Sequence, residues 1–397
     1  MRPKSPLAFL DPALRSVRAQ GLLRQMVATG SAPAPNVVCE GRDVVMLASN
    51  NYLGLANDPR VREAAAAATM RYGAGTGGSR LTTGTLDLHA RLEDALCRLK
   101  HAEAALLFNT GYMANVGVIT ALCGRGDVIF SDALNHASII DGCRQSHATI
   151  VVYAHNDMSD LEQKILLRKA AGGWRRGLVV SDSVFSMDGD IANVPALARL
   201  AHSHNLPLML DEAHATGVIG QTGHGSEEYF ALEHVPADCR PDIVMGTLSK
   251  ALGSEGGFVC GPRRLIAWLQ NSSRSFIFST ALPAASVAAA HKALEILVEE
   301  PQRVARLRSN IALFCRLLNE GGIPAHSPTA IVPVIVGDEK QAVHVAHTLL
   351  ERGCFVSAIR YPSVARGRAR LRFALCSEHD GEDLAKAAAS VIAALLQ

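Results

Sequence analysis

Apolar and polar residues alternate along the middle of the chain as short strand-like runs followed by longer helical stretches. Between about residues 57 and 285, "AALLFNTG" leads to "YMANVGVITALC", "DVIFSDAL" leads to "NHASIIDGCRQ", and "LVVSDSVFS" leads to "PALARLAHSH". Two further runs, "LPLMLDEAH" and "DIVMGTLSK", follow. Repeated strand-then-helix order is typical of a mainly parallel sheet covered by helices. The pattern therefore predicts an α/β fold with a ligand site at the carboxyl ends of the strands.

The pattern changes on both sides of this region. A segment with helical spacing, about residues 8 to 27, is followed by the Pro- and Ala-rich "GSAPAPN" and by short apolar runs that end in "MLASNNYLGL". After Pro283 a long helical stretch leads to "AIVPVIVG", "CFVSAIRYP" and "ARLRFALC". We therefore predict an N-terminal helix and crossing segment over 1–56, a large domain over 57–285 and a smaller α+β domain over 286–397.

Composition narrows the class of function. The 397 residues are 48% hydrophobic and 19% charged, and scattered Lys and Arg residues leave a formal net charge of +2. A globular protein with a small-molecule partner is expected, because nothing suggests an electrostatic footprint for nucleic acid or a membrane. None of the nine cysteines forms a CxxC pair, and "MRPKSPLAFLDPALRS" at the N-terminus has no uninterrupted apolar stretch. We expect reduced thiols, a cytoplasmic location and no metal site.

One glycine-rich segment matches a nucleotide-binding pattern by spacing alone. "GAGTGG", residues 73 to 78, has the spacing GxGxxG, but the preceding "VREAAAAATMRY" has a helical pattern. A dinucleotide-binding fingerprint needs a strand, then the glycines, then a helix. We therefore interpret these glycines as a flexible loop near a ligand or an interface.

Chemically reactive residues follow the ends of two predicted strands. Lys250 stands in "GTLSKALGSEGGF" directly after an apolar run, where loss of hydration lowers the pKa of an amine and makes it a usable nucleophile. Asp211 ends the apolar run of "LMLDEAHATG", where a buried carboxylate needs a cationic or hydrogen-bonding partner. The alternatives are a surface lysine in a loop and an aspartate that caps a helix.

Pyridoxal phosphate needs an amine for its aldehyde, an acid beside its pyridine nitrogen, a flat group over its ring and an anion site for its phosphate. Lys250 and Asp211 are candidates for the first two. His136 in "NHAS" is a candidate for stacking on the ring, although a histidine there is also compatible with a structural role. His214 is a candidate donor to the phenolic oxygen of the ring.

The anion site has its own candidates. "NTGYMANVG" turns from strand to helix at Gly111, so the backbone N–H groups of Gly111 and Tyr112 can hold a phosphate at a helix N-terminus. Thr247, three residues before the lysine, and Ser186 in "VFSMDGD" can supply hydroxyl groups. The four requirements of pyridoxal phosphate therefore all have candidates in this chain.

Four segments, "SDALNHASIIDG", "SVFSMDGDIANV", "DEAHATGVIG" and "GTLSKALGSEGGF", resemble the motifs of the α-oxoamine synthases, which are pyridoxal-phosphate enzymes. The resemblance runs from "SNNYLGLAND" to the final helix. It implies the aspartate aminotransferase fold (PLP fold type I), with a seven-stranded, mainly parallel sheet in the large domain. It also implies a homodimer with shared active sites.

The resemblance implies a role for each candidate residue. Lys250 matches the Schiff-base lysine, Asp211 the partner of the pyridine nitrogen and His136 the stacking histidine, and these are the catalytic residues implied. The other cofactor contacts implied are Gly111, Tyr112, Ser186, His214 and Thr247, with Ser279 and Thr280 of "SRSFIFSTALP" reaching the phosphate of the neighbouring subunit. The substrate contacts implied are Arg24, Asn50, Arg360, Ser363 and Arg372, and Arg372 of "ARLRFAL" matches the clamp for the amino-acid carboxylate.

Within the family, "GGSRLTTGTLDLHARLE" and "SKALGSEGGF" resemble the branch that condenses L-alanine with pimeloyl-CoA, or with the pimeloyl-carrier-protein thioester, in biotin synthesis. The reaction implied is a condensation with loss of CO₂, in which Lys250 is the base. "AIRYPSV" departs from the double-proline, threonine form of that branch, which bears on the choice of acyl chain. "SDALNHASIID" is equally close to glycine C-acetyltransferase, also called 2-amino-3-ketobutyrate CoA ligase. A serine palmitoyltransferase-like enzyme and an inactive protein that binds pyridoxal phosphate are the remaining alternatives.

Overall fold

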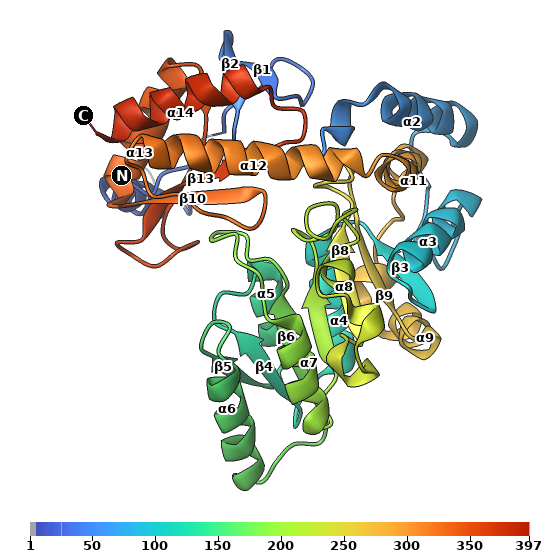
Figure 1. Ribbon diagram of the computed structural model, residues 1–397. Coiled ribbons are helices and arrows are strands. Elements are labelled where there is room, and N and C mark those ends of the chain that lie inside the picture. The colour runs from blue at the N-terminus through green and yellow to red at the C-terminus, as the bar shows by residue number, and fades with distance from the viewer. Residues whose placement is uncertain (1–4, 25, 397) are drawn as a thin grey trace.

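A computed structural model describes residues 5–24 and 26–396. The main sheet occupies the lower body in Figure 1, and both ends of the chain lie at the smaller upper part. In the described residues this sheet has seven strands, in the order β3 (Ala104–Phe108), β9 (Gly257–Gly261), β8 (Ile243–Thr247), β7 (Leu208–Asp211), β6 (Gly177–Asp182), β4 (Val128–Asp132) and β5 (Thr149–Tyr153). The pairs from β5 to β8 are parallel, and β9 is antiparallel to both of its neighbours. The predicted seven-stranded, mainly parallel sheet is confirmed.

Helices cover both faces of the main sheet because successive side chains of a strand point to opposite faces. Leu178 and Val180 of β6 pack in one cluster with side chains of α4 (Gly111–Leu122) and α5 (Ala137–Ser146). Val179, between them, packs on the other face with α6 (Met158–Ala170) and α7 (Val194–Ser203). The other helices described between residues 55 and 277 are α2 (Pro59–Tyr72), α3 (Asp87–Leu99), α8 (Ser226–Tyr229), α9 (Arg263–Ser272) and α10 (Arg274–Ile277), with the 3₁₀ helices η1 (Leu55–Asn57), η2 (Leu232–His234) and η3 (Ala237–Cys239).

The upper part combines both ends of the chain. β2 (Arg42–Met46) pairs antiparallel with β1 (Asn36–Cys39) and parallel with β11 (Cys354–Phe355). β13 (Ala369–Ala374) lies between β10 (Ile331–Gly337) and β12 (Ser357–Ile359). Helices α12 (Gln302–Glu320), α13 (Glu339–Glu351) and α14 (Gly381–Leu395) belong to this part, whereas α11 (Ala284–Glu299) packs on α2 and α3 (Figure 1). We retain the division at residues 56 and 285 as a proposal.

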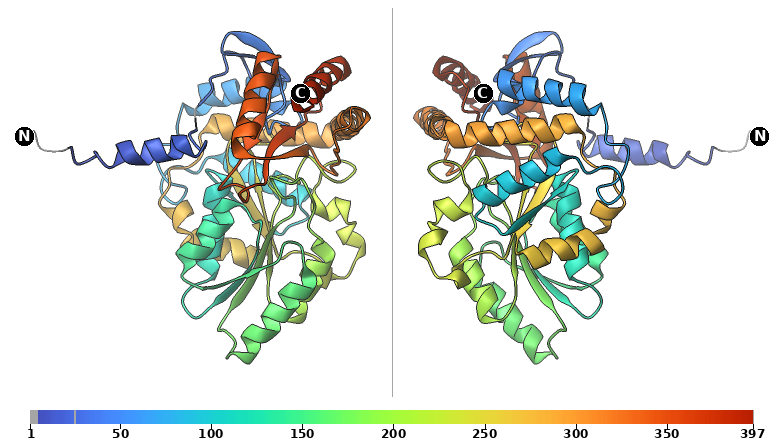
Figure 2. Two further views of the ribbon diagram at one scale, coloured as in Figure 1. Left: turned by 90° about the vertical axis from the view of Figure 1, so that its left-hand side faces the viewer. Right: turned by 90° about the vertical axis from the view of Figure 1, so that its right-hand side faces the viewer.

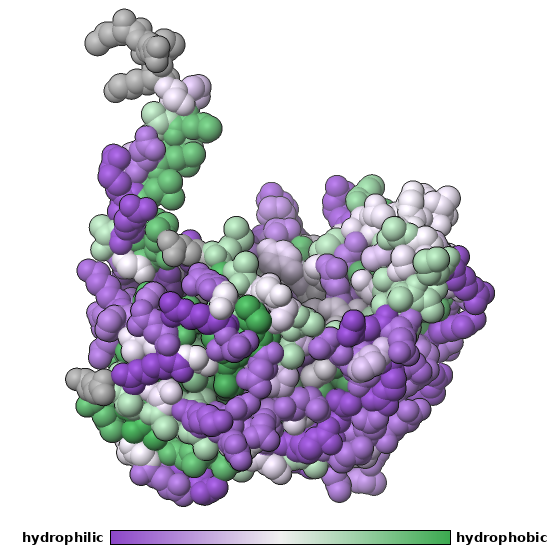
Figure 3. All heavy atoms as spheres, turned by 90° about the horizontal axis from the view of Figure 1, so that it is seen from above, coloured by the Kyte–Doolittle hydropathy of each residue, from purple (hydrophilic) through white to green (hydrophobic). Residues whose placement is uncertain are grey.

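The first helix is shorter than the predicted 8–27. α1 spans Leu10–Ala19 and ends where Gly21 takes a left-handed backbone, with φ +69°. The Leu22 N–H bonds back to the Val17 carbonyl and the Gly21 N–H to the Arg18 carbonyl, a pattern that closes a helix. Figures 2 and 3 show α1 projecting from the body, and its apolar Leu14 and Val17 are exposed.

The glycine-rich segment and the helix lengths bear on two sequence interpretations. The glycines of 73–78 follow α2, which ends at Tyr72, so a helix precedes them and the dinucleotide fingerprint is not formed. Within residues 5–24 and 26–396, no helix is both long and apolar enough to span a membrane.

Candidate active site

The carboxyl ends of the parallel strands meet at one edge of the main sheet and border a cavity of about 200 Å³. We call it the Lys250 cavity. Of the predicted cofactor residues, it brings together Gly111, Tyr112, His136, Asp211, His214, Thr247 and Lys250. Its other lining residues are Thr110, Asn115, Ser138, Asp182, Ala213, Met245 and Ser249.

Lys250 lies in the loop that joins β8 to β9. Its Nζ is 2.8 Å from Nε2 of His214. Loss of hydration lowers the pKa of Lys250 to about 8, although the carboxylates of Asp211 and Asp182 act in the opposite direction. A larger fraction of this amine is therefore neutral near pH 7 than for a solvated lysine, as a nucleophile or base requires.

Asp211, the last residue of β7, is buried and holds two hydrogen-bond donors. Oδ1 accepts from the Ala213 N–H and Oδ2 from Nδ2 of Asn115, each at 2.8 Å. The chain continues from Asp211 as a turn, and the next helix, α8, begins at Ser226. Asp211 therefore does not cap a helix, which removes the alternative interpretation of this residue.

Sequence reasoning missed Asn115. It lies one helical turn after Gly111, is fully buried, and donates through Nδ2 to Ser138 Oγ as well as to Asp211, both at 2.8 Å. Its Oδ1 has no hydrogen-bond partner in the described chain. The spacing of four residues from the strand-to-helix turn was the available signal, since residues i and i+4 share a face of a helix.

A second acid, Asp182, was also missed. It ends β6 at the position that pairs with Asp211 on β7, and it lines the same cavity. Burial, and secondly the charge of Asp211, raise the pKa of Asp182 well above its usual value. Its Oδ2 accepts a hydrogen bond from the His136 N–H at 2.7 Å. The sequence "VVSD" ends its strand just as "LMLD" does, which was the signal.

The N-terminus of α4 forms a cradle for an anion. Thr110 caps the helix by accepting from the Met113 N–H at 3.1 Å, and the N–H groups of the first turn have no carbonyl partner within the helix. A Cβ on Gly257 would lie 2.6 Å from the Thr110 carbonyl oxygen and 2.7 Å from the Gly111 nitrogen, so only glycine lets β9 approach this turn. Thr247 Oγ1 donates to the Gly256 carbonyl at 2.9 Å on the same side of the cavity.

His136 has a structural role as well as a place in the cavity. Its Nδ1 accepts from the Ser138 N–H at 3.2 Å and thereby caps α5, and the same nitrogen lies 2.7 Å from Ser138 Oγ. The ring also lines the Lys250 cavity. Stacking on a cofactor ring remains a prediction for this residue.

Arg372 on β13 joins the upper part of the molecule to the cavity. Nε donates to the Ser186 carbonyl at 2.5 Å, and Nη2 donates to Asn50 Oδ1 at 3.2 Å and to the Tyr52 hydroxyl at 3.3 Å. The Tyr52 hydroxyl is in turn 2.7 Å from Nδ1 of His214. The structure therefore brings together three predicted residues through Tyr52, which sequence reasoning missed.

Arg24, Arg360 and Ser363 form a separate group. Arg360 Nη2 donates to the Leu23 carbonyl at 2.8 Å, and the Ser363 N–H donates to the Arg360 carbonyl at 3.0 Å. Burial, and secondly the charge of Arg24, lower the pKa of Arg360. In the described part of the chain none of the three lines the Lys250 cavity.

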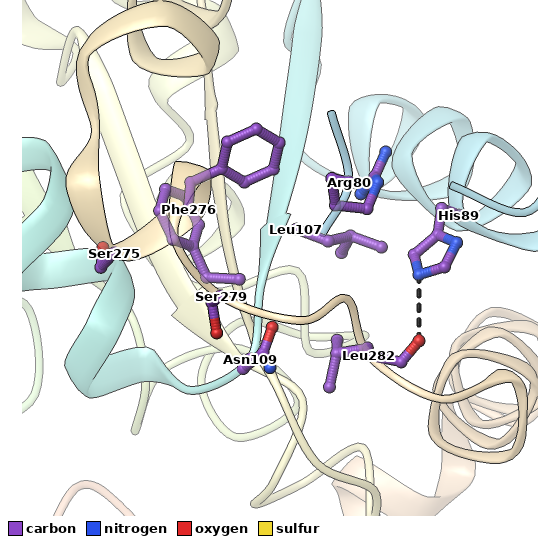
Figure 4. A pocket seen from close by; sticks show the side chains of 9 residues that line it. Arg80, His89, Leu107, Asn109, Ser275, Phe276, Ser279 and Leu282 are labelled. Atoms are coloured by element: carbon purple, nitrogen blue, oxygen red, sulfur yellow. Dashed lines mark hydrogen bonds between the residues drawn. The ribbon is translucent and has the colours of Figure 1, made fainter. Parts of the chain in front are cut away.

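Ser279 and Thr280 lie beside the anion cradle but outside the cavity. Figure 4 shows Ser279 in a smaller neighbouring cavity with Arg80, His89 and Asn109. Asn109, which precedes the cradle, donates to the Thr280 carbonyl at 2.6 Å. The predicted reach of this segment to a second subunit remains a prediction.

His89 holds the segment around Ser279 and Thr280 through the Leu282 carbonyl. Its two hydrogen bonds require the neutral imidazole. Nδ1 accepts from the Leu86 N–H at 3.0 Å, and Nε2 lies 3.2 Å from the Leu282 carbonyl, to which a protonated Nε2 donates (Figure 4). Burial, with a smaller effect of Arg80, lowers the pKa of His89 to about 4.

The folded state therefore binds fewer protons than the unfolded state between its pKa of about 4 and the unfolded value of about 6.5. We expect the contribution of His89 to stability to be complete above pH 6.5 and to fall by up to about 3 kcal/mol as the pH drops to about 4. Urea unfolding at a series of pH values checks this, with His89→Gln as the comparison. An equal acid-induced loss of stability in the variant would contradict the assignment.

Comparison with known proteins places the chain in a family. It matches the family described as aminotransferase class I and II over residues 42–391. It is 49% identical over 382 residues to the 8-amino-7-oxononanoate synthase of Geobacter sulfurreducens, covering 95% of each chain.

Two solved structures extend the comparison. A lysine-to-alanine variant of serine palmitoyltransferase from S. paucimobilis, with a bound aldimine of pyridoxal phosphate and myriocin, has a TM-score of 0.89 and 32% identity, covering 99% of this chain and 98% of that chain. The 8-amino-7-oxononanoate synthase of Francisella tularensis has a TM-score of 0.74 and 27% identity, covering 88% of this chain and 97% of that chain. With the cavity geometry and the four motifs, these likenesses show that the chain belongs to the class I and II aminotransferase family and, within it, to the α-oxoamine synthases.

Proposed function

We propose that this chain is a pyridoxal-phosphate-dependent 8-amino-7-oxononanoate synthase, which joins L-alanine to a pimeloyl thioester with loss of CO₂ in biotin biosynthesis. The observation that carries the proposal is the Lys250 cavity, which combines a lysine of lowered pKa, a buried aspartate and a helix N-terminus. The choice of branch is supported by relatives of that name, one of them 49% identical over nearly the whole chain.

The residues present fit pyridoxal phosphate. The N–H groups of Gly111 and Tyr112 would hold its phosphate, and Asp211 would hold the proton of its pyridine nitrogen. Asn115 lines the same cavity, and its Oδ1 has no hydrogen-bond partner among residues 5–24 and 26–396. When bound, the cofactor supplies an aldehyde for amines and a ring that stabilises a carbanion at the Cα of the amino acid.

The protein supplies the proton chemistry at Lys250 and the charge at Asp211. Nζ of Lys250 provides the amine that holds the cofactor and, once free, takes the Cα proton of alanine. Both oxygens of Asp211 accept hydrogen bonds, one from Nδ2 of Asn115 and one from the Ala213 N–H, which fixes the orientation of its carboxyl group. Burial, and secondly the charge of Asp211, raise the pKa of Asp182, which favours its neutral form, so we assign Asp211 and not Asp182 to the pyridine nitrogen.

Arg372 would bind the carboxylate of alanine. Its guanidinium is oriented by the Ser186 carbonyl through Nε, and by Asn50 and Tyr52 through Nη2. A planar guanidinium with several N–H groups suits a carboxylate, and His136, which lines the Lys250 cavity, would help to position the substrate.

The acyl substrate and the partner subunit would meet the protein at its exposed segments. We propose that Arg24, Arg360 and Ser363 contact the thioester, either of CoA or of an acyl carrier protein. We also propose a homodimer, supported by Phe278, which is 71% exposed directly beside Ser279 and Thr280. The cytoplasmic location stays a prediction.

A panel of alanine, glycine and serine against acetyl, pimeloyl and palmitoyl thioesters tests the proposed function. We expect alanine with the pimeloyl thioester to have the highest kcat/KM. One methyl group contributes only about 1–3 kcal/mol of discrimination, so glycine and serine should also bind and the acyl chain should decide the selectivity. The high structural likeness to serine palmitoyltransferase makes serine with palmitoyl-CoA the second candidate pair. A best result for that pair, or for glycine with acetyl-CoA, would refute the biotin branch but not the family.

Removing the guanidinium of Arg372 should change the KM values of the two substrates to different extents. We expect Arg372→Ala to raise the KM for alanine by at least about tenfold, because a hydrogen bond to a charged group contributes about 1.5–3 kcal/mol, and to leave the KM for the thioester nearly unchanged. Arg372→Lys keeps the charge without the paired N–H groups, so its KM for alanine should lie between those of the parent and Arg372→Ala. Steady-state kinetics with each substrate varied in turn checks this. Equal increases in both KM values would assign Arg372 to another role.

A further inference from the structure

The Tyr52 hydroxyl contacts three polar side chains. Tyr52 is 1% exposed, and its oxygen lies 2.7 Å from His214 Nδ1, 2.9 Å from Asn50 Oδ1 and 3.3 Å from Arg372 Nη2. His214 continues the chain of contacts, because its Nε2 lies 2.8 Å from Nζ of Lys250. One hydroxyl therefore connects the residue proposed to bind the substrate carboxylate with the lysine.

The available donors and acceptors allow only two hydrogen-bond patterns around the Tyr52 hydroxyl. Arg372 only donates, so the single hydrogen of the Tyr52 hydroxyl goes either to Asn50 Oδ1 or to His214 Nδ1. If it goes to Asn50, Nδ1–H of His214 donates to the Tyr52 oxygen and Nε2 is an acceptor. If it goes to His214, the proton of the neutral imidazole sits on Nε2, which becomes a donor towards Lys250.

The two arrangements differ in the charge of Lys250 that they accept. An ammonium group only donates, so protonated Lys250 can form its 2.8 Å contact only with an unprotonated Nε2. A neutral amine donates or accepts and is compatible with both. Protonated Lys250 therefore depends on an unbroken series of donors from Lys250 through His214 and Tyr52 to the oxygen of Asn50.

We propose that Tyr52 is a positioning residue that, with Asn50 accepting its hydrogen, allows His214 to accept a hydrogen bond from protonated Lys250. The inference concerns the chain before pyridoxal phosphate binds and rests on the proposed role of Lys250 as the amine that takes up the cofactor; the donor role implied for His214 applies once the phenolic oxygen is present. Tyr52 and Asn50 stabilise protonated Lys250 without contacting its protons.

Other charges face the same lysine, and the variants leave them in place. Asp211 on β7 and Asp182 on β6 favour protonated Lys250, whereas Arg372 on β13 disfavours it. Lys250, Arg372 and His136 lower the pKa of His214, after the larger effect of burial. Because Tyr52→Phe and Asn50→Ala change none of these groups, a shift in the titration of Lys250 reports on the series of donors itself.

The test is the pH dependence of covalent capture. The purified chain without cofactor is mixed with pyridoxal phosphate across pH values on both sides of about 8, quenched with borohydride at early times, and the peptide containing Lys250 is quantified. Tyr52→Phe and Asn50→Ala should each lower the pH midpoint of the initial rate by about one unit, which is a tenfold larger neutral fraction of Lys250 on the acid side. Tyr153→Phe is the matched control, because Tyr153 is equally buried and its hydroxyl has no hydrogen-bond partner in the described chain. Its midpoint should equal that of the parent.

The affinity for pyridoxal phosphate distinguishes an effect on the protonation of Lys250 from a general loss of cofactor binding. In Asn50→Ala the hydroxyl still donates to His214, so the affinity for pyridoxal phosphate should stay within about threefold of the parent while the midpoint falls. An unchanged midpoint in either variant, with capture still on Lys250, overturns the inference and leaves the proposed function intact. Absence of capture on Lys250 in the parent overturns both.

Discussion

Lys250→Ala should fold and should lose at least about a thousandfold in turnover, since one side chain provides both the amine for the cofactor and the base. No other lysine lines the cavity in the described part of the chain, so no neighbouring amine can substitute. Circular dichroism and thermal unfolding establish the fold, and product formation from alanine and a pimeloyl thioester gives the rate. Lys386→Ala is the control, because its ammonium lies on the exposed side of α14.

Reduction with borohydride gives the same prediction a readout independent of turnover. In the parent, the modified peptide should be the one that contains Lys250, and in Lys250→Ala no lysine peptide should carry the cofactor in stoichiometric amount. Modification of a different lysine in the parent, or turnover in the variant close to that of Lys386→Ala, would contradict the assignment of Lys250.

Asp211→Asn should weaken cofactor binding and lower kcat by about a hundredfold or more. A neutral amide does not hold a proton on the pyridine nitrogen. The structure adds a second cause: both oxygens of Asp211 accept hydrogen bonds, so either orientation of the new amide points its NH₂ group at a donor, Asn115 Nδ2 or the Ala213 N–H.

Asp182→Asn is the matched comparison for Asp211→Asn. The raised pKa of Asp182 favours its neutral form, so replacing its carboxyl group by an amide changes the charge of the cavity less than the loss of a full carboxylate would. Its effect on the dissociation constant of pyridoxal phosphate, measured by titration, should be at least about tenfold smaller than that of Asp211→Asn. Equal effects of the two variants would mean that Asp211 acts through packing and not through its charge.

The sequence predicted those site residues that follow apolar strands. Lys250 and Asp211 are polar residues placed where buried strands end, and the edge of a parallel sheet gathers such positions without further information. Tyr52 could not be found in this way. It meets His214 only because a segment far away in the sequence crosses the upper part, and "NNYLGL" has the appearance of ordinary apolar packing.

The lengths of elements were less predictable than their order. Residues 8–27 show continuous helical spacing, but the left-handed Gly21 ends the helix, and glycine imposes such an end only when the backbone takes that conformation. The roles of Arg24, Arg360 and Ser363 depend on substrates and remain predictions. Arg360, directly after β12, donates a hydrogen bond to the Leu23 carbonyl, a contact across the sequence that local patterns do not encode.

The position of β3 at the edge of the main sheet has a consequence for synthesis on the ribosome. In the described chain β3 pairs only with β9, which emerges roughly 150 residues later. At translation rates of about 5–20 residues per second, Leu106 to Phe108 wait about 8 to 30 s for their strand partner. The anion cradle waits equally long, because Gly257 completes its wall. The nascent chain therefore displays an unpaired apolar strand while about 150 of its 397 residues are added, and we expect chaperones that bind such segments to recognise it. We expect acquisition of the cofactor only after the end of the large domain has left the exit tunnel.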